Sequence, residues 1–143
     1  DTLISHNRFT ILNRSADAMF DHAHSNGIAI LNAAPYAGGV LAKGSAEMPR
    51  VTYQPADAET LAPVRALEAI CARKDIAPGA LALQFSINDP RITSTIVGVS
   101  KPERIDQTLD WAAATIAQEV WDEVAALGFS CEDPEANREY KPG

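Results

Sequence analysis

Three short runs rich in β-branched and apolar residues alternate with segments of helical spacing along this chain. The strand-like runs span residues 3–10, 28–34 and 93–99, and the middle one is almost continuously apolar, as a parallel strand covered on both faces would be. Strands that alternate with helices of this length predict right-handed βαβ crossovers and a parallel sheet. Because three parallel strands leave two unpaired edges, we expect an α/β chain that forms part of a larger sheet or barrel.

Helices are predicted between these strands and after the last one. They run from residue 16 to the stop signal at Asn26-Gly27, over 57–73 with Pro63 near the first turn, over 78–87, from Ser100 onward, and over 117–127. Ser100 and Glu103 fit a capping box, and the helix that follows is predicted to bury Ile105, Thr108, Leu109 and Ala112 on its inner face. Residues 37–56 are predicted to be a loop, and residues 129–143 an extended acidic tail.

The acidic composition narrows the classes of partner. The chain has 143 residues, enough for one domain or part of a larger one, and carries 12 Lys and Arg against 19 Asp and Glu, a net charge of −7. This balance argues against a nucleic-acid groove, which needs a basic stripe.

No apolar run approaches the roughly 18 to 20 residues that span a bilayer, and the first residues hold no signal peptide, so we expect a cytoplasmic protein without membrane contact. The widely spaced Cys71 and Cys131 favour a reduced chain in which Cys71 is buried.

The segment 96–105 is the most informative candidate site. A strand passes through Gly98 into a helix whose first N–H groups are free, an arrangement that favours a bound phosphate. Arg104 lies about one turn into that helix, where its guanidinium can clamp a second phosphate. The alternative is an ordinary βα turn with a capping Ser100 and a solvated Arg104.

Two further segments lie where parallel sheets bind ligands. Residues 32–39 follow the middle strand, and their small side chains leave room for a flat ring or a pyrophosphate; the alternative is a plain glycine-rich loop. His6 in the first strand is either a ligand partner or a structural histidine. His22 and His24 stand two apart on one short helix and point in different directions, so we predict surface residues and no metal site.

Four stretches taken together resemble one protein family. They are residues 7–14 (NRFTILNR), 27–35 (GIAILNAAP), 82–86 (ALQFS) and 95–100 (TIVGVS). The combination is similar to the C-terminal half of the aldo-keto reductases, which are (β/α)8 barrels that use a nicotinamide dinucleotide. Within that family it most resembles the branch of the aldose, fucose and galactose 1-dehydrogenases and pyridoxal 4-dehydrogenase, over nearly the whole chain.

The resemblance implies that the three strands are the sixth to eighth of a TIM barrel and that the last helix packs outside it. The cofactor-binding positions that it implies are Gly98, Val99 and Ser100 at the adenosine phosphate, Arg104 at the 2′-phosphate or adenine, Gln107 and Thr108 at the adenine amine, and Ala34, Pro35, Tyr36 and Gly38 along the pyrophosphate. Many relatives place a Tyr against the nicotinamide where this chain has Ala33, and a Gln against the carboxamide where it has His6. The choice between NAD and NADP stays open, since Arg104 has no further basic cluster beside it.

The family's catalytic Asp, Tyr, Lys and His lie on the first four barrel strands, and the resemblance matches none of them to this chain. We therefore expect residues 1–143 to form one unit, the C-terminal portion of an NAD(P)-dependent oxidoreductase that acts on an aldehyde or a sugar C1. This unit would be inactive alone and would need the N-terminal half of the barrel as its partner. Two alternatives are a non-catalytic, regulatory barrel relative that binds nucleotide and a half-barrel interaction scaffold.

Overall fold

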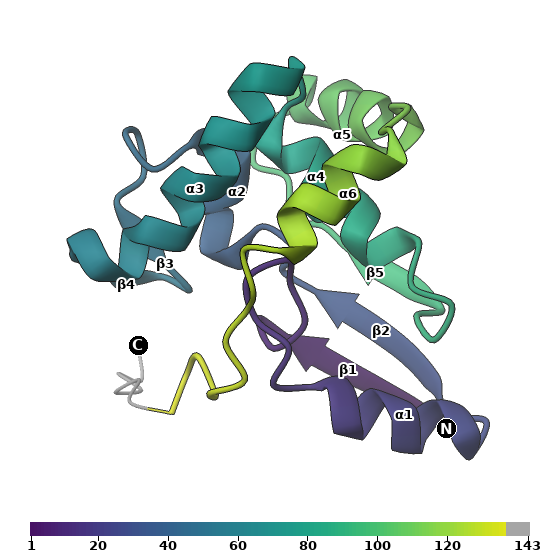
Figure 1. The fold of residues 1–143 in the computed structure, drawn as a ribbon. Helices are drawn as coiled ribbons and strands as arrows, with labels where there is room; N and C mark the ends of the chain where they lie inside the picture. Colours follow the sequence, from purple (N-terminus) through teal and green to yellow (C-terminus); the bar gives the residue numbers. More distant parts are fainter. Residues whose placement is uncertain (137–143) are drawn as a thin grey trace.

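The computed structural model describes residues 1–136 and is built around a three-stranded sheet (Figure 1). Strands β1 (Thr2–His6), β2 (Ala29–Ala33) and β5 (Ser94–Ile96) pair in the order β1-β2-β5. Both pairs are parallel, and His6, Ala33 and Ile96 lie side by side in the register. The predicted α/β class and parallel sheet are confirmed. The first two strands end earlier than expected because the next residues, Asn7 and Ala34, take left-handed φ values of 61° and 60°.

Helices connect the strands and cover one face of the sheet. Those of eight or more residues are α1 (Asp17–Ser25), α3 (Ala58–Lys74), α4 (Pro78–Ile87), α5 (Glu103–Ala113) and α6 (Gln118–Ala125). The bounds of α4 are those predicted, whereas the expectation that Pro63 marks the first turn of α3 is wrong. Asp57 caps α3 by accepting a hydrogen bond of 2.8 Å from the backbone N–H of Thr60, so the helix begins well before Pro63. Within the described residues, no helix is both long and apolar enough to cross a bilayer.

The segment predicted as a loop after β2 contains short elements of its own. They are a 3-10 turn, η1 (Ala37–Gly39), the single-turn helix α2 (Val40–Lys43) and a hairpin of β3 (Arg50–Val51) and β4 (Gln54–Pro55). The backbone N–H of Thr52 donates to the carbonyl of Ala37 at 3.0 Å and ties the hairpin to η1. Elements this short show no clear periodicity of apolar residues, so the sequence does not predict them. They are stabilised by tertiary contacts rather than by intrinsic propensity.

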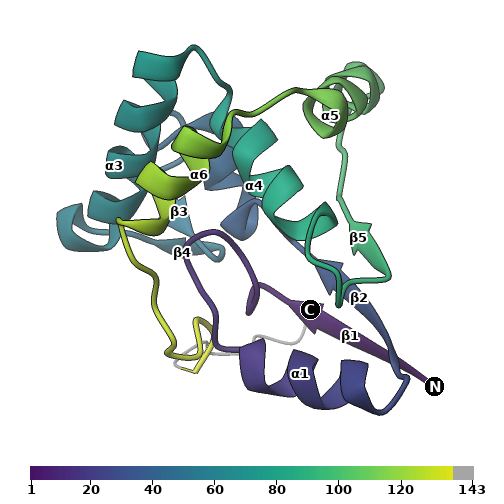
Figure 2. The same ribbon diagram turned by 45° about the vertical axis from the view of Figure 1, so that its right-hand side comes forward.

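The two faces of the sheet differ in cover. Helices α1 and α4 lie against the sheet (Figure 2). Ile30 and Asn32 are fully buried on the face toward these helices, since Ile30 shares a cluster with Phe20 of α1 and the Asn32 amide donates to Ser86 of α4. On the opposite face Ile4 is 62% and Ile96 43% exposed. The prediction that the middle strand is covered on both faces therefore holds for one face only in the described part of the chain.

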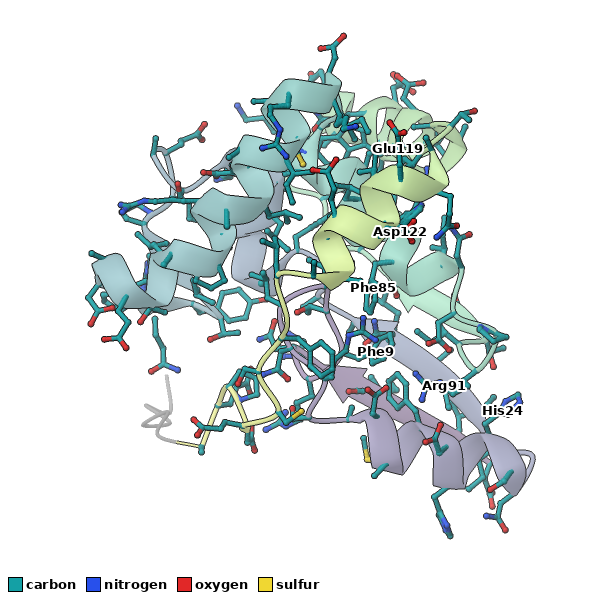
Figure 3. All side chains as sticks on the ribbon, in the orientation of Figure 1. Phe9, His24, Phe85, Arg91, Glu119 and Asp122 are labelled. Carbon is teal, nitrogen blue, oxygen red and sulfur yellow. The ribbon has the colours of Figure 1, made fainter. Side chains whose placement is uncertain are left out.

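Two apolar clusters stabilise the covered side. In one, Phe9 packs between Phe20 and Phe85, with ring centroids 4.9 and 5.0 Å away (Figure 3). The other joins α3, α4 and α6 through fully or almost fully buried residues such as Leu67, Leu81 and Val120. Cys71 belongs to this second cluster, as predicted, and Cys131 is exposed.

Helix α5 presents a different face to the molecule from the one expected. Ile105 and Leu109 are 50% and 62% exposed and Ala112 is exposed as well, so of the predicted inner face only Thr108 is partly buried. The partly buried positions are Arg104, Thr108 and Trp111, which recur at helical spacing. Apolar periodicity predicts a face but not what covers it, and here Trp111 sets the rotation of α5 against α4.

The last described residues run back along the loop that follows β1. The N–H of Arg14 donates to the carbonyl of Ser130 at 2.8 Å, and the side-chain amide of Asn13 donates to the carbonyl of Glu132 at 2.8 Å. We call residues 130–135 the C-terminal segment. Residues 137–143 of the predicted tail lie outside the described residues.

Candidate functional site

The carboxyl ends of the three parallel strands meet at one edge of the sheet. The N–H of Ala34 donates to the carbonyl of Ile96 at 3.3 Å, and the N–H of Asn7 donates to the carbonyl of Ala33 at 3.3 Å. The segments that follow β2 and β5 therefore start side by side. This is the edge at which parallel α/β sheets bind ligands.

Two adjoining cavities open at this edge. The inner cavity, of about 340 Å³, lies over the strand ends and is lined by His6, Ala33, Ala34, Pro35, Tyr36, Gly38, Gly39, Tyr53, Ile96 and Gly98. The outer cavity, of about 320 Å³, reaches α5 and is lined by Tyr36, Gly38, Gly39, Ala42, Lys43, Met48, Val97, Gly98, Val99, Ser100, Arg104, Gln107, Thr108 and Trp111. Every cofactor-binding position named from the sequence lines one of the two.

Gly38 belongs to both cavities because of its backbone geometry. Its φ is 77°, in the left-handed region, and a Cβ on it would stand 2.7 Å from the backbone nitrogen of Tyr53. Only glycine allows η1 and the hairpin to approach this closely. Gly98 differs, since a Cβ there would meet nothing within 4 Å, which leaves room for a ligand beside the turn.

The predicted capping box at Ser100 is not formed. Pro102, whose φ of −55° is already helical, is the N-cap of α5, and no side chain caps the helix. The first turn of α5 carries Glu103 and Asp106, whose negative charges oppose an anion at this helix end. An anion beside Ser100 must therefore find its partners elsewhere.

Those partners are two basic side chains. Lys43 from α2 and Arg104 from α5 both line the outer cavity, and no Asp or Glu is among the residues that line either cavity. The chain as a whole has a net charge of −7, yet the charged side chains that line these cavities are both basic, which favours an anionic ligand. Sequence reasoning missed Lys43 because its segment was predicted to be a loop. The local feature that could have indicated Lys43 is its place about one helical turn after Gly38 and Gly39.

Tyr36 lines both cavities, and its hydroxyl group is buried. Among the described residues, the Tyr36 hydroxyl makes no hydrogen bond of ordinary geometry, although Tyr36 is only 9% exposed. Burial raises the pKa of this phenol and the nearby Thr108 hydroxyl partly opposes that shift, so Tyr36 is neutral at physiological pH. Thr108 itself donates to the carbonyl of Arg104 at 2.7 Å.

The inner cavity has a polar wall on the side of β1. Nε2 of His6 lies 3.4 Å from the hydroxyl of Tyr53, and the two rings stack with centroids 5.8 Å apart. Nδ1 of His6 lies 3.2 Å from a carboxylate oxygen of Glu135, in the C-terminal segment. Sequence reasoning missed Tyr53 and Glu135, since no local pattern brings residues so distant in the chain to His6.

These residues fit the dinucleotide that the sequence resemblance implies. Lys43 and Arg104 suit phosphate groups, and the amide of Gln107 suits a purine edge. Ala33 and Ala34 leave room for a planar ring over the strand ends. Nothing comparable exists for a metal: residues 1–136 hold no group of three or more His, Cys, Asp or Glu placed to bind one, and His22 and His24 are exposed.

Two known proteins and one family are similar to this chain in sequence. The chain is 28% identical over 123 residues to a pyridoxal 4-dehydrogenase of Microbacterium luteolum, an alignment that covers 85% of the chain and 36% of the relative. It is 27% identical over 127 residues to a D-threo-aldose 1-dehydrogenase of a Pseudomonas species, covering 87% of the chain and 39% of that relative. The chain thus spans less than two-fifths of the length of these two relatives. The sequence profile of the Aldo/keto reductase family matches residues 1–128, and the chain belongs to that family.

Proposed function

We propose that this chain is the dinucleotide-binding part of an NAD(P)-dependent oxidoreductase. The observation that carries the proposal is the pair of adjoining cavities at the strand ends, with Lys43 and Arg104 on the wall of the outer one and no Asp or Glu among the residues that line either. The adenosine phosphates would lie in the outer cavity and the nicotinamide end in the inner one. The bound cofactor would supply the hydride acceptor or donor at its nicotinamide ring.

The chain's own residues would bind and orient that group. Arg104 and Lys43 would balance phosphate charge, and Gln107 and Thr108 would face the adenine. Ala33 and His6 would form the floor and one wall at the nicotinamide end. Except for Lys43, these are the roles that the sequence resemblance implies.

We further propose that the sheet is the sixth to eighth strand of a (β/α)8 barrel. Two observations support this: one sheet face is uncovered around Ile4 and Ile96, and α5 exposes Ile105 and Leu109. Both surfaces suit further strands and helices of the same barrel. Those strands would supply the Asp, Tyr, Lys and His that the family uses, so this chain alone would bind cofactor without turnover.

The whole protein would oxidise or reduce at an aldehyde or a sugar C1. Support comes from the two relatives, one a pyridoxal 4-dehydrogenase and the other a D-threo-aldose 1-dehydrogenase. The same exposed surfaces also suit self-association as an interaction scaffold. Light scattering separates the two ideas, because a monomer that binds dinucleotide argues for the oxidoreductase and a nucleotide-free oligomer for the scaffold.

Titration of the chain with NAD and with NADP, followed by calorimetry, tests the proposal. Arg104→Ala and Lys43→Ala each remove a charge-assisted hydrogen bond and are expected to weaken binding about 10- to 100-fold. Arg65→Ala on the exposed side of α3 removes the same charge outside the cavities and should leave affinity unchanged. Equal affinity of all three variants for both cofactors would contradict the assigned site.

A further inference from the structure

Glu135 connects the C-terminal segment to the wall of the inner cavity. Its Oε1 atom lies 2.7 Å from Nδ2 of Asn7 and 3.2 Å from Nδ1 of His6. A guanidinium nitrogen of Arg8 lies 3.7 Å from its Oε2 atom. The Glu135 side chain is 16% exposed, whereas that of His6 is 42% exposed. Three consecutive residues at the end of β1 thus converge on one sheltered carboxylate.

The C-terminal segment holds Glu135 in place from two sides. On one side, Asp133 forms an ion pair of 3.0 Å with Arg8. On the other, the carbonyl of Pro134 accepts a hydrogen bond of 3.3 Å from the amide of Gln54, in the β3–β4 hairpin. The carboxylate is therefore fixed relative to both the first strand and the hairpin that carries Tyr53.

The ionisation of Glu135 determines which nitrogen of His6 carries the proton. Burial acts to raise the pKa of Glu135, but hydrogen bonds from Asn7 and His6 outweigh it, and the net shift is downward. An ionised carboxylate only accepts hydrogen bonds, so Nδ1 of His6 must donate. In the neutral ring Nε2 is then an acceptor, and the hydroxyl of Tyr53 donates to it.

We infer that Glu135 is a positioning residue that holds His6 as a hydrogen-bond acceptor on the wall of the inner cavity. The 3.4 Å contact from Tyr53 is near the long limit for such a bond, so a ligand donor can share or replace it at Nε2. The wall therefore favours a ligand group with N–H or O–H donors, such as a carboxamide or a sugar hydroxyl, over a bare carbonyl oxygen. This inference rests on the proposed function for the identity of the ligand, but not for the state of His6.

The tautomer of His6 is measured by long-range ¹H–¹⁵N NMR on the 143-residue chain without cofactor at pH 8. The parent chain is expected to show a protonated Nδ1, and Glu135→Ala to lose that preference. Glu135→Gln keeps an acceptor oxygen and should retain it. Glu132→Ala removes an exposed carboxylate from the same segment and should change nothing. A protonated Nε2 in the parent, or an unchanged tautomer in Glu135→Ala, would overturn the inference.

A binding experiment separates positioning from general support of the fold. NAD and ADP are titrated into the parent, Glu135→Ala and Glu132→Ala. A positioning role predicts about tenfold weaker NAD binding by Glu135→Ala with ADP binding unchanged, since one hydrogen bond is lost at the nicotinamide end only. Equal losses for both probes would mean a structural role and reject the inference. Failure of the parent to bind NADP as well as both of these probes would reject the proposed function, and the tautomer would still decide the role of Glu135.

Discussion

Gly79 of α4 lies directly against the indole ring of Trp111 of α5, so that a Cβ on Gly79 would stand 2.3 Å from Cζ3 of the indole. The carbonyl of Trp111 also accepts a hydrogen bond of 2.9 Å from the amide of Gln84, on the same helix as Gly79. Because Trp111 lines the outer cavity and packs edge-on against Tyr36, this contact places α5 relative to the site.

Gly79→Ala is expected to destabilise the chain and weaken cofactor binding together. The added methyl group must displace a large ring from a packed position, which costs about 1–3 kcal/mol. Urea unfolding measures the loss. Gly98→Ala is the matched control for stability, because its methyl group enters open space. A Gly79→Ala chain as stable as the parent would show that α5 is not seated on α4 in this way.

Asp89→Asn is expected to lower stability at neutral pH by about 1–3 kcal/mol, since it removes the charge of the least exposed of the three carboxylates that pair with Arg91. Arg91 bonds to Asp89 at 2.8 Å and also to Asp17 and Asp21. Burial acts to raise the pKa of Asp89, but Arg91 outweighs it and the pKa lies below its usual 3.8. Such a group stabilises the fold fully above its unfolded pKa, and the stabilisation disappears as the pH falls through the folded pKa.

The difference in unfolding free energy between parent and Asp89→Asn should therefore shrink as the pH drops below 3.8. Urea titrations at neutral and acidic pH provide the comparison. Asp110→Asn, an exposed position on α5, should track the parent at every pH. A difference that stays constant on acidification would exclude the Asp89–Arg91 pair as its source.

The two cysteines should differ sharply in reactivity. Burial, with a smaller effect from Glu68, raises the pKa of the Cys71 thiol to about 11, so little thiolate exists at pH 8. Cys131 is exposed. A thiol reagent should modify one cysteine of the native chain quickly and the second only after unfolding. Cys131→Ser should abolish the fast reaction; a fast reaction that persists would place Cys71 at the surface.

Leu109→Ala on α5 should change the stability of this chain by no more than about 0.5 kcal/mol. Leu67→Ala, the same change at a fully buried position, should cost about 2–5 kcal/mol. Thermal unfolding of the two variants makes the comparison. A large loss for Leu109→Ala would mean that the exposed face of α5 is covered in solution by another copy of the chain.

Most strands and long helices could be predicted from the sequence, because the spacing of apolar residues and the residues that end helices are features of short stretches of the chain. The parallel strands, the bounds of α4 and the end of α1 before Gly27 are of this kind. The elements between residues 37 and 56 could not, since contacts rather than propensity hold them. The face that α5 turns inward was also mispredicted, because it depends on a tertiary contact: the indole of Trp111 packs against Gly79.

Some residues of the candidate site could likewise be predicted from the sequence, and others could not. Residues next to the strand ends, such as Ala33 and Gly98, follow from the rule for parallel sheets, and the structure gathers them into one pair of cavities. Whether they bind a cofactor stays a prediction. Tyr53 and Glu135 reach the inner cavity or its wall through tertiary folding alone, and no spacing in the sequence points to them. Lys43 reaches the outer cavity through tertiary folding too, although its place one turn after Gly38 and Gly39 was a local signal.

The contact between His6 and Glu135 joins residues 129 positions apart. A chain is synthesised from its N-terminus, so β1 exists long before the carboxylate that orients its last residue. Bringing such distant residues together costs conformational entropy. Few favourable contacts offset this cost until the intervening helices have folded. Ribosome-bound nascent chains would therefore acquire their sheet first, with the imidazole of His6 still free to rotate, and gain the ordered wall as one of the final steps of maturation.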